Sequence, residues 1–180
     1  MKRILLDTYN YCAAILQPYG GCHRLIELGR RNVFEPVTTD VIMAEFVAKC
    51  RQGMTKKNIT FSEEQIQRFV DALRPMLTIK NMKKVSIGRD YIPTPEGYKL
   101  PLNELLFQIT GRSREDLLEV VWAHGKIMPS KADLRDLHVI VAAIEQDCDY
   151  IVTNNTKDFP KQIGKIRVIT VHEALAMLTE

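Results

Sequence analysis

Four acidic residues stand where the chain enters or leaves an apolar segment, and their type points to a cation site. Asp7 ends "RILLD", Glu45 lies inside "VIMAEFVA", Asp136 precedes "LHVIVAAI", and Asp158 follows "YIVTNN". Four carboxylates cannot lie close together in ionised form without a cation, because like charges repel. Oxygen ligands without His or Cys favour Mg²⁺ or Mn²⁺ over zinc. We therefore expect a Mg²⁺ or Mn²⁺ centre.

Each acid also has a purely structural explanation. Asp7 could be a turn residue or the N-cap of the next helix. Glu45 could be a solvated residue at the edge of an apolar helix stripe, and Asp158 could belong to a polar strand-to-loop turn. For Asp136 we favour a ligand role, because a helix dipole contributes only about 0.3–1 kcal/mol. These explanations do not account for the recurrence of acids at strand ends and helix starts.

Polar neighbours accompany two of the acids. Thr153 and Asn155 stand where "YIVTNN" leaves its strand, and we expect them to support the site. Asp133 lies three residues before Asp136, on the same helix face. It also ends a Ser-x-x-Asp pattern that is typical of a capping box, so its main role is expected to be structural.

This chemistry indicates a class of reaction. A carboxylate-bound Mg²⁺ or Mn²⁺ ion activates water and stabilises the charge of a phosphodiester displacement. We therefore expect a metal-dependent enzyme acting on phosphate esters, with nucleic acid as the substrate. A phosphatase with an aspartate nucleophile would have a second acid at position 9, which is Tyr9. An RNA- or protein-binding module without activity and a metal-binding structural or regulatory protein are the competing hypotheses.

Strand-like and helix-like segments alternate along the chain. The expected strands are residues 3–7, 33–39, 85–87, 150–153 and 166–171, and the expected helices are 9–17, 22–31, 40–52, 62–76, 102–111, 113–125, 130–147 and 172–180. This alternation predicts an α/β fold with a mainly parallel sheet. In such sheets, sites form beyond the carboxyl ends of the strands, where three of these segments end in polar residues.

Composition bounds the remaining choices. A chain of 180 residues, 46% apolar and 26% charged, suits one domain spanning residues 1–180. The net charge of +3 is uneven, with a basic first half and an acidic second half, which is compatible with binding a polyanion near carboxylates. No apolar run is long enough for a membrane span, so we expect a cytoplasmic protein.

The four cysteines form no C-x-x-C pair and are expected to be buried or free thiols. Trp122 is expected in the core.

Three stretches together resemble a known family. The order "ILLDT", "TTDVIMAEF" and "DLRDLHVIVAAIEQDCDYIVTNNTKDFP" resembles PIN-domain ribonucleases, especially the VapC-like toxins of bacteria and archaea. The resemblance covers roughly 1–75 and 130–175. It implies a PIN-like three-layer α/β/α sandwich, Mg²⁺- or Mn²⁺-dependent cleavage of RNA, a homodimer and a protein antitoxin. An inactive PIN scaffold that binds RNA or protein is the competing interpretation.

The same resemblance assigns roles to individual residues. It implies that the catalytic, metal-binding acids are Asp7, Glu45, Asp136 and Asp158, and that the supporting residues are Thr8, Asn155 and Asp133. Residues 86–127 are longer than a compact toxin needs, and we treat them as an atypical insertion. Charged and aromatic residues interleave in its proline-rich part, which can grip single-stranded RNA. Otherwise it is a surface loop followed by two packing helices.

Overall fold

The architecture is seen in a computed structural model that describes residues 1–76, 78–80, 102–124 and 134–179. Its central sheet has six strands in the order β3-β2-β1-β4-β6-β5. Five strands are parallel, and β5 runs antiparallel to β6 at one edge. The strands are β1 (Arg3–Leu6), β2 (Glu35–Thr39), β3 (Thr78–Lys80), β4 (Tyr150–Val152), β5 (Gln162–Ile163) and β6 (Ile166–Ile169).

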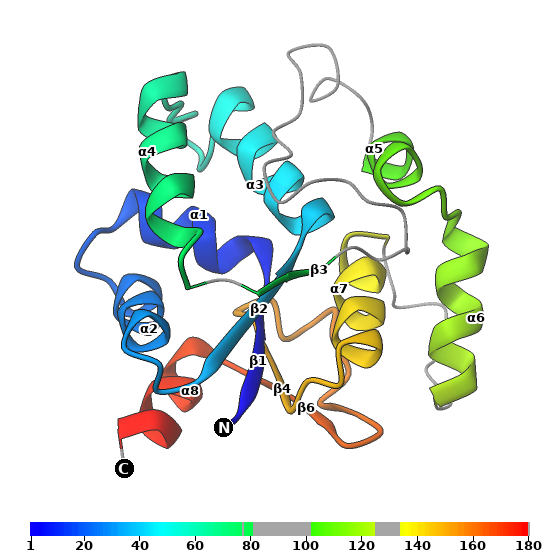
Figure 1. Ribbon diagram of the computed structural model, residues 1–180. Helices are drawn as coiled ribbons and strands as arrows, with labels where there is room; N and C mark the ends of the chain where they lie inside the picture. The colour runs from blue at the N-terminus through cyan, green and yellow to red at the C-terminus, as the bar shows by residue number, and fades with distance from the viewer. Residues whose placement is uncertain (77, 81–101, 125–133, 180) are drawn as a thin grey trace.

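Helices cover both faces of this sheet (Figure 1). They are α1 (Thr8–Leu16), α2 (Gly21–Arg30), α3 (Asp40–Gln52), α4 (Glu63–Leu73), α5 (Leu102–Thr110), α6 (Arg114–His124), α7 (Leu134–Glu145) and α8 (Val171–Thr179). One layer contains α1, α2 and α8, and the other contains α7 packed against α5 and α6. The predicted three-layer α/β/α sandwich with a mainly parallel sheet is therefore confirmed.

The middle strand of the sheet is buried on both faces. Ile4, Leu5 and Leu6 of β1 are all fully buried, between β2 on one side and β4 on the other. A strand covered by helices on both faces needs a continuous apolar run instead of an alternating one. That requirement explains why "RILL" contains three aliphatic residues in succession and why the first polar residue, Asp7, comes where the strand ends.

Helix α3 follows β2 without a loop and lies over the carboxyl ends of the strands (Figure 1). Thr39 ends the strand and caps the helix, because its side-chain oxygen accepts a hydrogen bond of 3.2 Å from the backbone N–H of Ile42. The helix contacts α1 on one side and α5 on the other. Its second turn, which carries Glu45, is thereby held above the sheet edge.

Most of the predicted elements are present in the structure, with small differences at their ends. Neither β3 nor β5 was predicted, and the expected strand at 85–87 lies outside the described residues. The expected burial of Trp122 is wrong, because 52% of this side chain is exposed. All four cysteines are buried and free, as expected. Among the described helices, none has the length and apolar character to cross a bilayer.

The proposed insertion at 86–127 is only partly visible in the structure. The two helices expected within it are present as α5 and α6. Residues 81–101 and 125–133 are outside the described part of the chain, and so the proline-rich stretch and Asp133 are too. The single-domain interpretation with an insertion therefore stays a prediction.

Candidate active site

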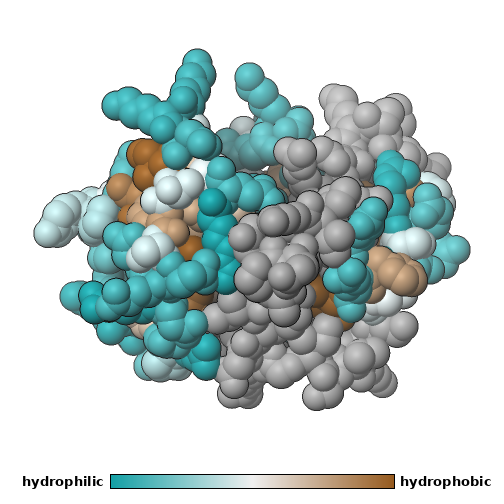
Figure 2. Space-filling model, turned by 90° about the horizontal axis from the view of Figure 1, so that it is seen from above, coloured by the Kyte–Doolittle hydropathy of each residue, from teal (hydrophilic) through white to brown (hydrophobic). Residues whose placement is uncertain are grey.

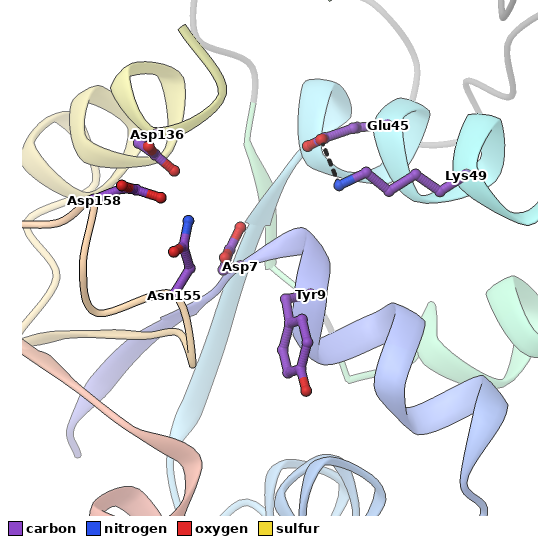
Figure 3. A pocket seen from close by; sticks show the side chains of 7 residues that line it. All are labelled: Asp7, Tyr9, Glu45, Lys49, Asp136, Asn155 and Asp158. Atoms are coloured by element: carbon purple, nitrogen blue, oxygen red, sulfur yellow. Dashed lines mark ion pairs between the residues drawn. The ribbon is translucent and has the colours of Figure 1, made fainter. Parts of the chain in front are cut away.

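A pocket of about 300 Å³ lies beyond the carboxyl ends of β1 and β4 (Figure 3). Four acids that lie far apart in the sequence contribute to its wall. The lining residues are Asp7, Tyr9, Glu45, Lys49, Asp136, Asn155 and Asp158. They come from the β1–α1 junction, from α3, from the first turn of α7 and from the loop after β4.

Asp7 is held at the centre of the pocket by the end of β4. Its backbone N–H donates to the carbonyl of Val152 at 3.2 Å, which continues the β1–β4 pairing. The hydroxyl of Thr153 donates to Asp7 Oδ2 at 2.8 Å and accepts from the backbone N–H of Asn155 at 3.0 Å. Thr153 therefore fixes Asp7 and the following loop in one arrangement.

The pKa of the Asp7 carboxyl is raised. Burial is the main cause, and the negative charge of Glu45 adds to it, while the hydrogen bond from Thr153 and the charge of Lys49 oppose the shift. Desolvation and a like charge both disfavour ionisation. The carboxylate would be stabilised by a positive charge in the pocket.

Glu45 is buried at the opposite wall and has partners on both carboxylate oxygens. The hydroxyl of Thr8 donates to Oε2 at 2.5 Å, and His138 Nε2 lies 3.6 Å from the same oxygen. Lys49 Nζ lies 2.9 Å from Oε1. Burial alone would raise the pKa of Glu45, but His138 and Lys49 outweigh it and hold the pKa at about 2. Glu45 is consequently a charged residue whose position is fixed from three directions.

The other polar groups of the pocket face Glu45 across its opening (Figure 3). Asp136 is buried in the first turn of α7, whereas Asn155 and Asp158 are exposed on the loop after β4. Asp136 and Asp158 lie near one another in this view, with Asn155 and Asp7 between them and the Glu45–Lys49 pair. The side of the pocket opposite Glu45 thus carries a buried acid, Asp136, an exposed acid, Asp158, and the amide of Asn155.

The donor chemistry of the pocket fits a hard divalent cation. Four carboxylates and one amide oxygen are the ligand types that Mg²⁺ and Mn²⁺ prefer. In the described part of the chain, however, no three His, Cys, Asp or Glu side chains are grouped so that they could hold a metal ion. The two carboxylate oxygens of Glu45 are engaged by Thr8, Lys49 and His138.

Sequence reasoning did not assign a site role to four residues that shape this pocket. Lys49 and Tyr9 line the pocket, and 45% of Tyr9 is exposed. Asn10 is fully buried, and its amide donates to the Val152 carbonyl at 2.6 Å, which joins α1 to β4. His138 is fully buried, and its Nε2 lies 3.6 Å from Glu45 Oε2. The spacing of Glu45 and Lys49, four residues apart on a helix, was the one available signal.

The described part of the upper surface of the molecule is largely hydrophilic (Figure 2). Seen from above, the coloured atoms are mostly those of hydrophilic residues, with smaller apolar areas between them (Figure 2). A polar surface of this kind suits a charged, hydrated ligand better than an apolar one.

The fold agrees with a comparison against known families. The PIN domain family matches residues 3–157, and the chain belongs to this family. No curated protein matches the chain. Among solved structures, it is similar to VapBC2 from Rickettsia felis bound to a DNA fragment from their promoter, with a TM-score of 0.52. That match covers 93% of this chain and 98% of the other at 18% sequence identity, so it shows a shared fold.

Proposed function

We propose that this protein is a metal-dependent endoribonuclease that hydrolyses RNA phosphodiester bonds. The observation that carries the proposal is the meeting of Asp7, Glu45, Asp136 and Asp158, from four separate segments, around one pocket. Membership of the PIN domain family supports nuclease activity in general. A binding module without activity gives no reason for a buried carboxylate such as Asp7 to be placed beside Glu45 at a cost in desolvation.

All four acids have a task in this proposal. Asp7, Glu45 and Asp136, which are set in the fold, would hold the cation, and Asp158 on the exposed loop would complete its ligands from the solvent side. Thr8 and Thr153 would keep Glu45 and Asp7 in orientation through the hydrogen bonds described above. A bound Mg²⁺ or Mn²⁺ ion would supply charge neutralisation for the phosphodiester and activation of water. Without a cation, the acids would repel the substrate.

We further propose that the protein is the toxin of a toxin–antitoxin pair, acts in the cytoplasm and forms a homodimer. One solved structure with a similar fold is a VapBC2 complex. Phe107 on α5 and Trp122 on α6 are 58% and 52% exposed, and large apolar side chains of this kind are often covered by a protein partner. Light scattering of the purified protein tests the dimer, and co-purification with the product of a neighbouring reading frame tests the antitoxin.

The test of the enzymatic proposal is cleavage of a mixed RNA pool with Mg²⁺, with Mn²⁺ and with EDTA. The wild type is expected to cleave with either metal and not with EDTA, and Asp7→Asn is expected to lose at least about 100-fold in rate. Asp147→Asn is the matched control, because Asp147 is exposed and pairs with Lys165 away from the pocket. RNA binding without cleavage by the wild type would instead support the inactive scaffold.

A further inference from the structure

We propose that Lys49 binds a phosphate of the RNA substrate and releases Glu45 when a divalent cation enters the pocket. This inference rests on the ribonuclease function proposed above and adds a residue to its substrate-binding side. Lys49 would then have two states, one paired with Glu45 in the free protein and one paired with the substrate. The first state is the one that the structure shows.

The position of Lys49 gives it access to both partners. It lies one helical turn after Glu45 on α3, and its ammonium group points to the Glu45 carboxylate at the pocket wall (Figure 3). Among the residues that line this pocket in the described part of the chain, it is the one with a basic side chain. Its side chain is 43% exposed, so its end is open to solvent and to a ligand.

Two of the three contacts that fix Glu45 do not involve Lys49. Thr8 and His138 contact Oε2 from the protein interior, whereas Lys49 contacts Oε1. The ion pair joins a buried carboxylate to an ammonium group whose side chain is 43% exposed, so the lysine end of the pair is the one that can exchange partners. The pair can therefore separate while the glutamate stays in place, and the freed Oε1 becomes available to a cation.

A lysine side chain is ordinarily protonated at neutral pH, as phosphate binding requires. A lysine is a compact charge on a flexible stem, which allows it to move from a carboxylate to a phosphate oxygen nearby. In a pocket with four acids, such a charge would offset part of the repulsion that a polyanion meets.

The competing explanation is that Lys49 and Glu45 form an ordinary ion pair that stabilises the helix. The two explanations predict different changes in metal and RNA affinity when Lys49 is removed. If Lys49 only stabilises α3, its removal lowers the melting temperature slightly and leaves the affinity for RNA unchanged. If Lys49 competes with the cation for Glu45 and then binds substrate, its removal strengthens metal binding and weakens RNA binding. The opposite changes in the two affinities are what a purely structural role cannot produce.

The experiment compares the wild type with Lys49→Met, Lys49→Gln and Lys49→Arg. Mn²⁺ affinity is measured by calorimetry without RNA, and kcat and KM are measured on the RNA pool with Mg²⁺. We expect Lys49→Met and Lys49→Gln to bind Mn²⁺ about threefold more tightly and to raise KM about tenfold, the scale of one charge-assisted hydrogen bond. Lys49→Arg should restore most of KM, because it keeps the charge.

Lys165→Met is the matched control, because Lys165 also pairs with an acid, Asp147, and lies on an exposed turn away from the pocket. It should change neither Mn²⁺ affinity nor KM. Suppose that the wild type cleaves RNA. If both neutral Lys49 variants then have the KM of the wild type, or if both bind Mn²⁺ more weakly than the wild type, the Lys49 proposal is overturned while the ribonuclease function stands. If the wild type cleaves no RNA with either metal, the proposed function fails and the Lys49 proposal fails with it. Thermal melting of each variant separates these outcomes from unfolding.

Discussion

The hydroxyl of Thr153 donates a hydrogen bond of 2.8 Å to the carboxylate of Asp7, and this bond joins the ends of β4 and β1 at the pocket. The same hydroxyl accepts from the backbone N–H of Asn155, so one threonine orders both the central acid and the loop that leads to Asp158. Because the bond favours the charged form of Asp7, it opposes the effect of burial on the pKa of that carboxyl.

Replacing Thr153 by valine keeps the shape of the side chain and removes this donor. We expect Thr153→Val to lose about 1–2 kcal/mol in the free energy of unfolding at neutral pH, since a buried carboxylate loses a partner. The pKa of Asp7 should rise further, which moves the acid limb of the cleavage profile to higher pH. Urea unfolding and a pH–rate profile measure the two effects. Thr60→Val, at an exposed position, is the control, and an unchanged acid limb in Thr153→Val would contradict the prediction.

His138 should support metal binding by orienting Glu45 from the interior. It is fully buried, and its Nε2 lies 3.6 Å from Glu45 Oε2. We expect His138→Leu to weaken Mn²⁺ affinity about tenfold, as is common when a partner of a metal ligand is removed. This change is opposite in sign to that expected for Lys49→Met, and calorimetry detects both. His172→Leu, on the exposed side of α8, should have no effect, and equal affinities of His138→Leu and wild type would exclude the orienting role.

The variants Asp136→Asn and Asp158→Asn should lose similar amounts of activity but should differ in their melting temperatures. Changing either to Asn is expected to reduce cleavage at least about 100-fold, because each removes a charged ligand from the proposed centre. Asp136 is 6% exposed and lies in the first turn of α7, so Asp136→Asn should also shift the melting temperature, whereas Asp158→Asn at an exposed position should not. Cleavage assays and thermal melting give the two readouts. Full activity of Asp158→Asn would remove this residue from the site.

Asp40 should make stability depend on pH. It is 3% exposed at the start of α3, and its Oδ2 has no hydrogen-bond partner among the described residues. Burial raises the pKa of its carboxyl from 3.8 to about 6. The folded state therefore prefers the protonated acid, so the stability gained from protonation is complete below about pH 4 and is lost as the pH rises through about 6.

An asparagine at position 40 would imitate the protonated acid at every pH. Two pKa units correspond to about 3 kcal/mol, and the lost charge–dipole interaction at the helix start removes about 0.3–1 kcal/mol of that gain. We expect Asp40→Asn to be about 2 kcal/mol more stable than the wild type at pH 8 and equally stable at pH 4. Urea unfolding at the two pH values measures the difference. A variant less stable than the wild type at pH 8 would show that the charged carboxylate is itself stabilised in the fold.

The fold was predictable where local pattern and tertiary burial agree. The run "RILLD" has to be a central strand that ends at its first acid, and "LHVIVAAI" has to be a buried helix, because both are apolar on every side. The positions of Asp7 at the end of β1 and of Asp158 on the loop after β4 followed from the same reasoning, since parallel strands bring their carboxyl ends to one sheet edge. Strand β3, with three residues, and β5, with two, are too short to leave a periodic pattern.

Other features depend on contacts that a sequence does not specify. Trp122 occurs in "LLEVVWAHG", where an apolar residue is expected to face the core, but Leu117, Leu118 and Val121 already fill the buried side of α6. Lys49 has the spacing of an ordinary surface ion pair with Glu45. It becomes notable only because Asp7, Asp136 and Asp158 arrive at the same pocket from other segments.

The order of the strands also determines when the pocket can exist during synthesis. β1 is synthesised long before β4, although the two strands are neighbours in the sheet. A nascent chain that has already folded α1 and α3 holds Asp7 and Glu45 but lacks Thr153 and Asp158. A pocket that contains all four acids therefore forms only after β4 and the loop that follows it have been synthesised.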